Sequence, residues 1–204
     1  MKRRTWLIVI SALSLVGSLA LVGQTSAGEK TDFFGTDKFC PPEINALGLC
    51  GPVAGSIVDE GTVTCIGGEL TGIPLYPCSE ETIRIKTRGY IIKTIFETGN
   101  PFVDGEATIS INANYDAESN GPGWGTISIN PDAYEGTWDG TWTGKSVREG
   151  EFLWTITVHA SIQGHGDGVD GMLYRAVDTI TAYTPGVAFY DGILEGWILD
   201  PHSK

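Results

Sequence analysis

The sequence is poor in basic residues, and this shortage limits the partners that the protein can have. Among 204 residues, 13 are Lys or Arg and 25 are Asp or Glu. Three of the 13 basic residues and none of the 25 acidic residues precede residue 28, so residues 28–204 carry a formal charge of −15. So acidic a surface repels phosphate backbones and anionic lipids. Nucleic acid is not an expected partner, and the charge is interpreted as an aid to solubility, with calcium as counter-ion the alternative.

Motifs that carry well-known chemistry are also absent. The chain has no G-x-S-x-G, no H-E-x-x-H and no phosphate loop. After residue 27, no segment shows a helical period with caps, and none is long and apolar enough to span a membrane. These absences weigh against an enzyme, and no cofactor or metal is predicted. They leave the oligomeric state open.

The first 27 residues differ in character from the rest. Three basic residues at positions 2–4 precede an apolar run of about 17 residues over 6–22, and small and polar residues follow up to Ala27. A basic start, an apolar middle and a small-residue exit predict a secretory signal peptide, cleaved after Ala27. The alternative is an uncleaved anchor, but a bilayer needs roughly 20 apolar residues. The protein is therefore expected to be exported, either secreted or periplasmic, with no membrane span after cleavage.

Cysteines are few and confined to one region. Cys40, Cys50, Cys65 and Cys78 all lie in the first third of residues 28–204. An even number of cysteines in an exported chain predicts two disulfides, for which three pairings are possible. The spacings do not fit zinc, because there is no C-x-x-C and no paired His downstream.

Two regions follow the expected signal peptide. Residues 28–80 hold the four cysteines, several prolines and a Gly67-Gly68 pair, and only Ser56–Cys65 alternates like a strand. Proline and glycine without a period do not build a ladder of strands. We therefore predict an irregular, disulfide-stapled segment that packs on residues 81–204 as one folding unit.

Residues 81–204 alternate with the period of β-strands. Apolar and polar residues alternate cleanly over Glu106–Tyr115 and Glu151–Gln163, and turn residues separate these runs from similar ones at 82–96, 125–130, 172–183 and 187–199. Strands at this spacing with one apolar face favour an antiparallel β-barrel of about eight strands. Glycines within strands suit the bends of a barrel. The alternative is a β-sandwich.

The first candidate site is the tandem repeat Gly136–Gly144. In an extended strand, Trp138 and Trp142 share one face with the three glycines, roughly 13 Å apart. The rings could form an aromatic platform for a sugar or another flat apolar ligand. The alternative is a core strand, because Trp is mostly buried in proteins.

Two further candidates involve charged residues. His159 lies on the polar face of its strand, and His165 and Asp167 follow in a glycine-rich turn where the three could converge as acid, base or metal ligand. The alternative is a glycine-built hairpin with polar residues facing water. Arg84 begins a run of three cations on one strand face, which could anchor an anionic ligand or pair with acidic residues on the next strand.

A resemblance to known families rests on glycine-rich strands. Residues Glu135–Gly144, Gly164–Met172 and Gly192–Gly196 resemble late strands of the allene oxide cyclase-like and dirigent-like barrels, as in uncharacterised exported bacterial proteins. The resemblance covers at most residues 81–200. It implies an eight-stranded barrel with an apolar cavity that steers a reactive small molecule. No position matches a catalytic residue of either family, and the cysteine-bearing segment 28–80 departs from them.

Three functions follow in order of expectation. The first is a non-enzymatic exported barrel that binds a small, largely apolar molecule. The second is a cofactor-free isomerase or cyclase, which predicts that His159, Arg84 or Glu195 faces the cavity. The third is a carbohydrate-binding or cell-surface adhesion module with an exposed Trp138–Trp142 platform.

Overall fold

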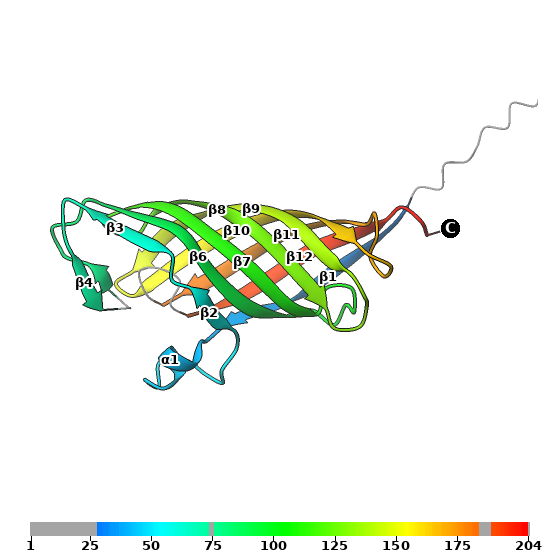
Figure 1. The fold of residues 1–204 in the computed structure, drawn as a ribbon, viewed down its shortest axis with the longest axis horizontal. Coiled ribbons are helices and arrows are strands. Elements are labelled where there is room, and N and C mark those ends of the chain that lie inside the picture. Colours follow the sequence, from blue (N-terminus) through cyan, green and yellow to red (C-terminus); the bar gives the residue numbers. More distant parts are fainter. Residues whose placement is uncertain (1–27, 74–75, 184–188, 204) are drawn as a thin grey trace, which may run out of the picture.

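The computed structural model describes residues 28–73, 76–183 and 189–203 (Figure 1). The expected signal peptide lies outside the described residues. The described chain contains twelve strands and one short helix, α1 (Pro42–Asn45). The strands are β1 (Glu29–Phe39), β2 (Ser56–Asp59), β3 (Thr62–Ile66), β4 (Leu70–Ile73), β5 (Tyr76–Cys78), β6 (Arg84–Glu97), β7 (Gly105–Asp116), β8 (Gly121–Pro131), β9 (Thr137–Gly150), β10 (Leu153–His165), β11 (Leu173–Ala182) and β12 (Tyr190–Asp200).

Eight of these strands close into a ring, which confirms the predicted antiparallel barrel. Its order is β1-β12-β11-β10-β9-β8-β7-β6, and β6 pairs again with β1. All the pairings are antiparallel, and strands β6 to β12 follow one another as a meander. The ring is uneven, because β1 pairs with β12 along its whole length but with β6 only over Thr36–Lys38. We call this short β1–β6 contact the seam.

The edge of β6 beside the seam is covered by the N-terminal segment. The partner of β6 changes along its length from β3 at Arg84–Arg88, to β2 at Ile91–Lys93, to β1 at Ile95–Glu97. Between the first two partners, Gly89 adopts φ of +67°, where the pairing of β6 with β7 shifts register. Segments from residues 56–66 thus pair with the part of β6 that β1 does not reach.

The strands turn apolar side chains into the barrel and polar ones outward. On β10, Trp154, Ile156 and Ile162 face the core, whereas His159 and Gln163 are exposed. The same alternation fills the interior from every strand, so that the buried side chains form one continuous core. Interior glycines make room for the largest rings, since a Cβ at Gly123 would lie 3.2 Å from the Trp142 ring.

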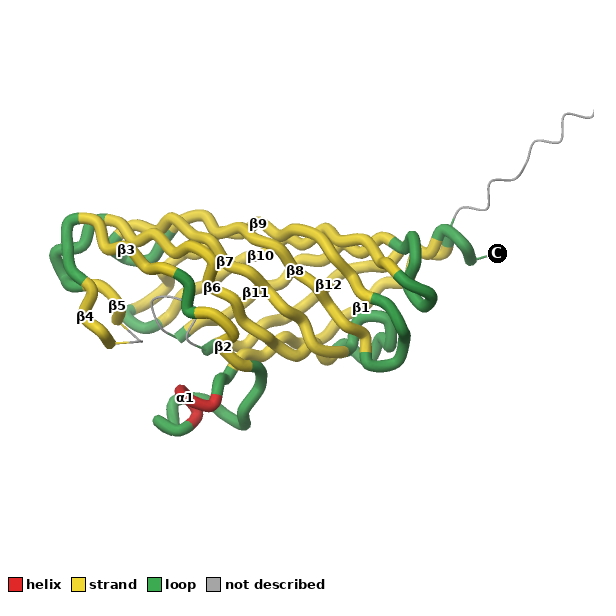
Figure 2. The backbone as a smooth tube through the Cα atoms, in the orientation of Figure 1, coloured by secondary structure: helices red, strands yellow, loops and turns green. Residues whose placement is uncertain are grey.

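The N-terminal segment is more regular than the sequence analysis predicted. Its first part, β1, is a full strand of the ring, so the barrel begins at residue 29 and not at residue 81. The predicted alternation over Ser56–Cys65 corresponds to β2 and β3. The remainder forms α1 beside the barrel wall and the β4–β5 ribbon at one end, away from the C-terminus (Figure 2).

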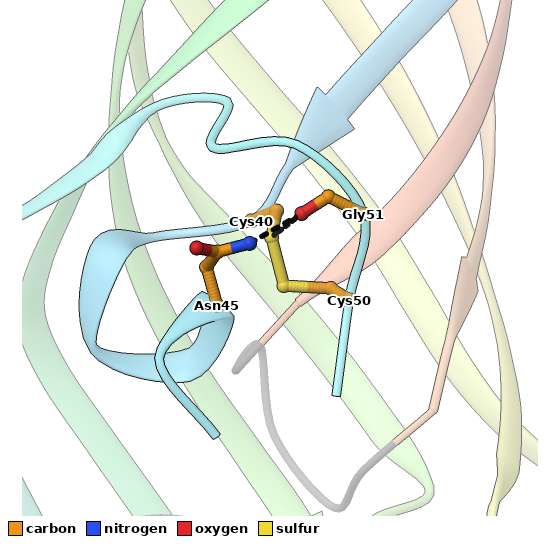
Figure 3. Close-up of a disulfide and its surroundings, with 4 residues drawn as sticks. All are labelled: Cys40, Asn45, Cys50 and Gly51. Carbon is orange, nitrogen blue, oxygen red and sulfur yellow. Dashed lines mark hydrogen bonds between the residues drawn. A yellow bond between two sulfur atoms is a disulfide. The ribbon is translucent and has the colours of Figure 1, made fainter. Parts of the chain in front are cut away.

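Both predicted disulfides are present. Cys40 pairs with Cys50 and Cys65 pairs with Cys78, which selects one of the three pairings left open by the sequence. The first bridge fastens the α1 loop to the end of β1 (Figure 3). In the same loop the Asn45 side-chain amide donates a hydrogen bond of 2.6 Å to the Gly51 carbonyl oxygen. The loop is thereby held against the strand that makes the seam.

Candidate functional site

The barrel lumen contains a cavity of about 60 Å³. Its walls are almost wholly apolar and include Ile109, Trp142, Ile156, Ala176 and Ile180. A water molecule needs roughly 10–15 Å³ on this measure, so the space corresponds to a few waters or one slender molecule. An eight-stranded barrel is just wide enough for its side chains to fill, or to hold one small ligand.

One end of the lumen is filled by side chains. Val103, Ile129, Trp138 and Val169 are fully buried there, next to the β6–β7, β8–β9 and β10–β11 loops. The Trp138 indole nitrogen donates a hydrogen bond of 2.7 Å to the Phe102 carbonyl oxygen, which fixes the ring. None of these four residues lines the cavity, which lies further along the barrel.

A buried aspartate, Asp37, interrupts the apolar lining at the seam. Its side chain is 1 % exposed, and it accepts hydrogen bonds from the hydroxyl groups of Thr94 on β6 and Tyr190 on β12. The Tyr190 bond measures 2.8 Å. Thr94 Oγ1 also lies 2.6 Å from the carbonyl oxygen of Lys38 on β1. The Thr94 contacts join β1 and β6, whose backbone pairing is the shortest in the ring.

Asp178 on β11 forms a carboxyl pair with Asp37. Burial raises the pKa of Asp37 to about 6, although its hydrogen bonds to Thr94, Tyr190 and Asp178 oppose this rise. Burial, together with the neighbouring Asp37 charge and the hydrogen bond to Asp37, raises the pKa of Asp178 to about 10. No hydrogen-bond donor among the described residues reaches Asp178 Oδ1. A proton held by Asp178 and donated to Asp37 accounts for the raised pKa of Asp178 and for the absence of a donor at its Oδ1. Two carboxyl groups can form a hydrogen bond with each other only when one of them is protonated.

Glycine at position 192 makes this pairing possible. Gly192 on β12 pairs with Asp37 of β1 on one side and with Ile180 of β11 on the other. It therefore lies between the two strands that carry the carboxyl groups. A Cβ at this position would lie 2.6 Å from Asp178 Oδ1. Any larger residue would therefore displace the Asp178 carboxyl group from its place beside Asp37.

Tyr174, also on β11, is a further polar residue that lines the cavity. Its side chain is 1 % exposed, and its hydroxyl oxygen has no hydrogen-bond partner among the described residues. Burial, together with the nearby Asp178 and Asp37 charges, raises the pKa of the Tyr174 phenol well above its ordinary value. Burial acts in the same direction on Tyr190. Both phenols are therefore neutral hydrogen-bond donors.

The structure places the two predicted tryptophans inside the barrel. Trp138 is fully buried at the filled end, and Trp142 is 7 % exposed and lines the cavity. Trp142 is held by a 2.9 Å hydrogen bond from its indole nitrogen to the Ser110 carbonyl oxygen. The exposed platform that a surface sugar-binding module requires is absent at these two residues, so that interpretation is wrong for them.

The predicted charged residues lie on the outer surface. His159, His165, Asp167 and Arg84 are all exposed, and Glu195 is exposed as well. His159 faces outward between Thr143 and Val177, so it is separated from the lumen by the sheet itself. Arg84 stands opposite Asp116 on β7, but the structure shows no ion pair between them, so the pairing with an acidic residue stays a prediction. The expectation that His159, Arg84 or Glu195 faces the cavity is wrong.

Sequence reasoning missed Asp37, Asp178, Thr94, Tyr174 and Tyr190 as site residues. A usable signal was present for Asp178. It lies on the same face of the strand as Tyr174, Ala176 and Ile180. A carboxylate on an apolar strand face is costly unless it is protonated or paired. No comparable signal marks Thr94, whose hydroxyl group becomes important only when the seam brings β1 alongside β6.

Comparisons with known proteins add no identification. No model of a protein family matches the chain, and neither a curated protein nor a solved structure matches it. Among the described residues, no helix is long and apolar enough to cross a membrane. Within the same residues, no group of three or more His, Cys, Asp or Glu side chains could hold a metal ion.

Proposed function

We propose that this protein binds a small, largely apolar molecule in the lumen of its barrel. The observation that carries the proposal is the apolar cavity itself, walled by side chains from all eight strands of the ring. Apolar pockets with a few polar groups in fixed positions are the usual form of small-molecule sites. Here those polar groups are the Asp37–Asp178 pair and Tyr174.

The small volume of the cavity limits the ligand to a slender shape. At about 60 Å³, the cavity has space for a few water-sized groups. A straight chain fits a narrow lumen better than a ring does. We therefore choose n-hexane as the test molecule, because it has no polar group and reports apolar binding alone.

The test measures hexane binding by the fluorescence of Trp142, which lines the cavity, and by the shift in thermal unfolding. Binding to the folded state alone raises the unfolding temperature as the concentration of hexane rises. Ala176→Leu places extra volume in the lumen and should abolish both signals. Thr179→Leu, on the exposed face of the same strand, is the matched control and should retain them. Absence of any saturable hexane signal in the native protein contradicts the proposal.

The expected export of the protein belongs to the same proposal. Two disulfides suit an oxidising compartment outside the cytoplasm. A secreted or periplasmic barrel with an acidic exterior would carry or capture an apolar molecule where such molecules are poorly soluble.

A second candidate function, proton-transfer catalysis without a cofactor, is favoured by one observation. The pKa values of Asp37 and Asp178 are moved apart, to about 6 and about 10. Such a pair offers one carboxylate as base and one carboxylic acid as proton donor near pH 7. The test is exchange of the α-protons of 2-hexanone in deuterated water, followed by proton NMR. Exchange at the buffer rate would exclude this function for ketones.

A further inference from the structure

The hydroxyl group of Tyr174 is rigidly placed. Its ring stacks on Phe33 with centroids 5.2 Å apart and packs against Trp138 at 5.8 Å. These contacts leave the ring little freedom to turn its hydroxyl group elsewhere. Tyr174 lines an apolar cavity, and its hydroxyl group has no hydrogen-bond partner among the described residues.

The nearby Asp37 carboxylate is already occupied by other donors, and Asp178 Oδ1 receives no donor from the described residues, Tyr174 included. Asp37 accepts hydrogen bonds from Thr94 and Tyr190, and the proton of Asp178 is directed to Asp37. A buried donor without an acceptor is destabilising in a folded protein, because it has lost its hydrogen bonds to water. Such a cost is explained when the missing acceptor is part of a bound molecule.

We infer that the molecule bound in the lumen is neutral and carries a hydrogen-bond-accepting oxygen, as an alcohol or ketone does, which accepts a hydrogen bond from the Tyr174 hydroxyl group. The inference rests on the proposed lumenal binding and names the chemical class of the ligand. The apolar remainder of the ligand occupies the space lined by Ile109, Ile156 and Ile180.

The charge in the lumen excludes anionic ligands. The ionisable groups that line the cavity are two carboxyl groups and tyrosines, and no Lys or Arg lines it. An anion would lose its hydration in apolar surroundings and would face the Asp37 carboxylate. A fatty acid anion is therefore a poor ligand, although its chain would suit the walls.

The experiment compares four six-carbon molecules: n-hexane, 1-hexanol, 2-hexanone and hexanoate. Each is titrated at pH 7.5 into the native protein and into Tyr174→Phe. The native protein should bind 1-hexanol and 2-hexanone roughly three- to tenfold more tightly than n-hexane, the usual gain from one neutral hydrogen bond. Hexanoate should bind at least tenfold more weakly than 1-hexanol. Tyr174→Phe should remove the preference for oxygen and leave the affinity for n-hexane unchanged.

Two further measurements separate this role from a structural one. Tyr115→Phe is the matched control, because Tyr115 lines the same cavity, and it should keep the preference for oxygen. Tyr174→Phe should unfold at the same temperature as the native protein or a higher one, since it removes a buried donor without a partner. A lower unfolding temperature would assign the hydroxyl group a structural partner and overturn the inference. Equal affinity for n-hexane and its oxygenated analogues would also overturn it, while lumenal binding stands. Failure of all four molecules to bind contradicts the proposed function instead.

Discussion

At the scale of single residues, the unusual feature of this barrel is a pair of acids in an apolar interior. Asp37 and Asp178 are 1 % and 7 % exposed, and neither has a basic partner among the residues that line the cavity. An isolated buried carboxylate is very costly, so a protein keeps such a group by protonating or hydrogen-bonding it. Here the two carboxyl groups share one proton, and the hydroxyl groups of Thr94 and Tyr190 donate hydrogen bonds to the negatively charged Asp37.

The raised pKa values predict that the protein is more stable in acid than in mild base. Both carboxyl groups hold their protons in the folded state above pH 3.8, their ordinary pKa, where the unfolded chain has lost them. The unfolded state then binds fewer protons, so stability falls as pH rises. The loss extends from about pH 4 to pH 6 for Asp37 and up to about pH 10 for Asp178. The slope should be on the order of 1 kcal/mol per pH unit.

Urea unfolding at pH 5 and pH 8 measures this effect. The native protein should be more stable at pH 5, and Asp178→Asn, which cannot ionise but can donate to Asp37, should show a smaller difference. Asp167→Asn changes an exposed carboxyl group on the β10–β11 loop and is the control. Equal stability of the native protein at the two pH values would contradict the assigned protonation.

Gly192 gives a second prediction at this scale. Its replacement by Ala forces the new methyl group against Asp178 Oδ1, at 2.6 Å before any adjustment. Gly192→Ala should therefore lower the unfolding free energy by about 1–3 kcal/mol. In Gly150→Ala the new Cβ lies at an ordinary 3.6 Å from Leu153, and the change should stay within about 0.5 kcal/mol. A Gly192 variant as stable as the Gly150 variant would show that the space beside Asp178 is not tightly filled.

At the scale of elements, the seam depends on side chains as well as on backbone pairing. The β1–β6 contact is confined to Thr36–Lys38 and Ile95–Glu97, while every other junction of the ring is longer. Thr94 adds contacts from β6 to both Asp37 and the Lys38 carbonyl oxygen at this position. Thr94 and Asp37 therefore help to close the barrel, and Asp37 also lines its cavity.

Thr94→Val tests this role, because valine keeps the shape of threonine and removes its hydroxyl group. Thr94 is fully buried, so the change should cost about 1–3 kcal/mol of unfolding free energy. Amide hydrogen exchange should quicken at Asp37 and Lys38 more than on β9. Thr143→Val, on the exposed face of β9, should change neither quantity appreciably. Unchanged exchange at the seam would show that backbone pairing alone closes the ring.

The elements differ in how well the sequence predicts them. Clean alternation over Glu106–Tyr115 and Glu151–Gln163 located β7 and β10 to within about two residues. Strand β1 escaped prediction because its inward positions include Gly35 and Asp37, while Phe34 points outward and is 62 % exposed. The site was missed for the same reason, since its acids occupy positions where an apolar residue is the norm. Closure of the ring, which brings β1 to β6, depends on long-range geometry that no local pattern encodes.

At the scale of the whole molecule, the barrel combines a packed end with a hollow middle. Side chains such as Trp138 and Val169 fill the region beside the β10–β11 loop, and the cavity follows beyond them. The N-terminal segment, with its two disulfides, covers the edge of β6 next to the seam (Figure 1). In this account the cavity is the functional centre, and His159 and Arg84 lie outside it, each lining a hollow on the outer surface.

The most direct test of the central claim is to locate bound n-hexane by nuclear Overhauser effects to assigned methyl groups of the protein. The account predicts contacts from hexane to Ile156, Ala176 and Ile180, which line the lumen. Contacts confined to Val177 and Ile193, which are exposed on the outer face, would contradict it, because they would place the apolar site on the surface.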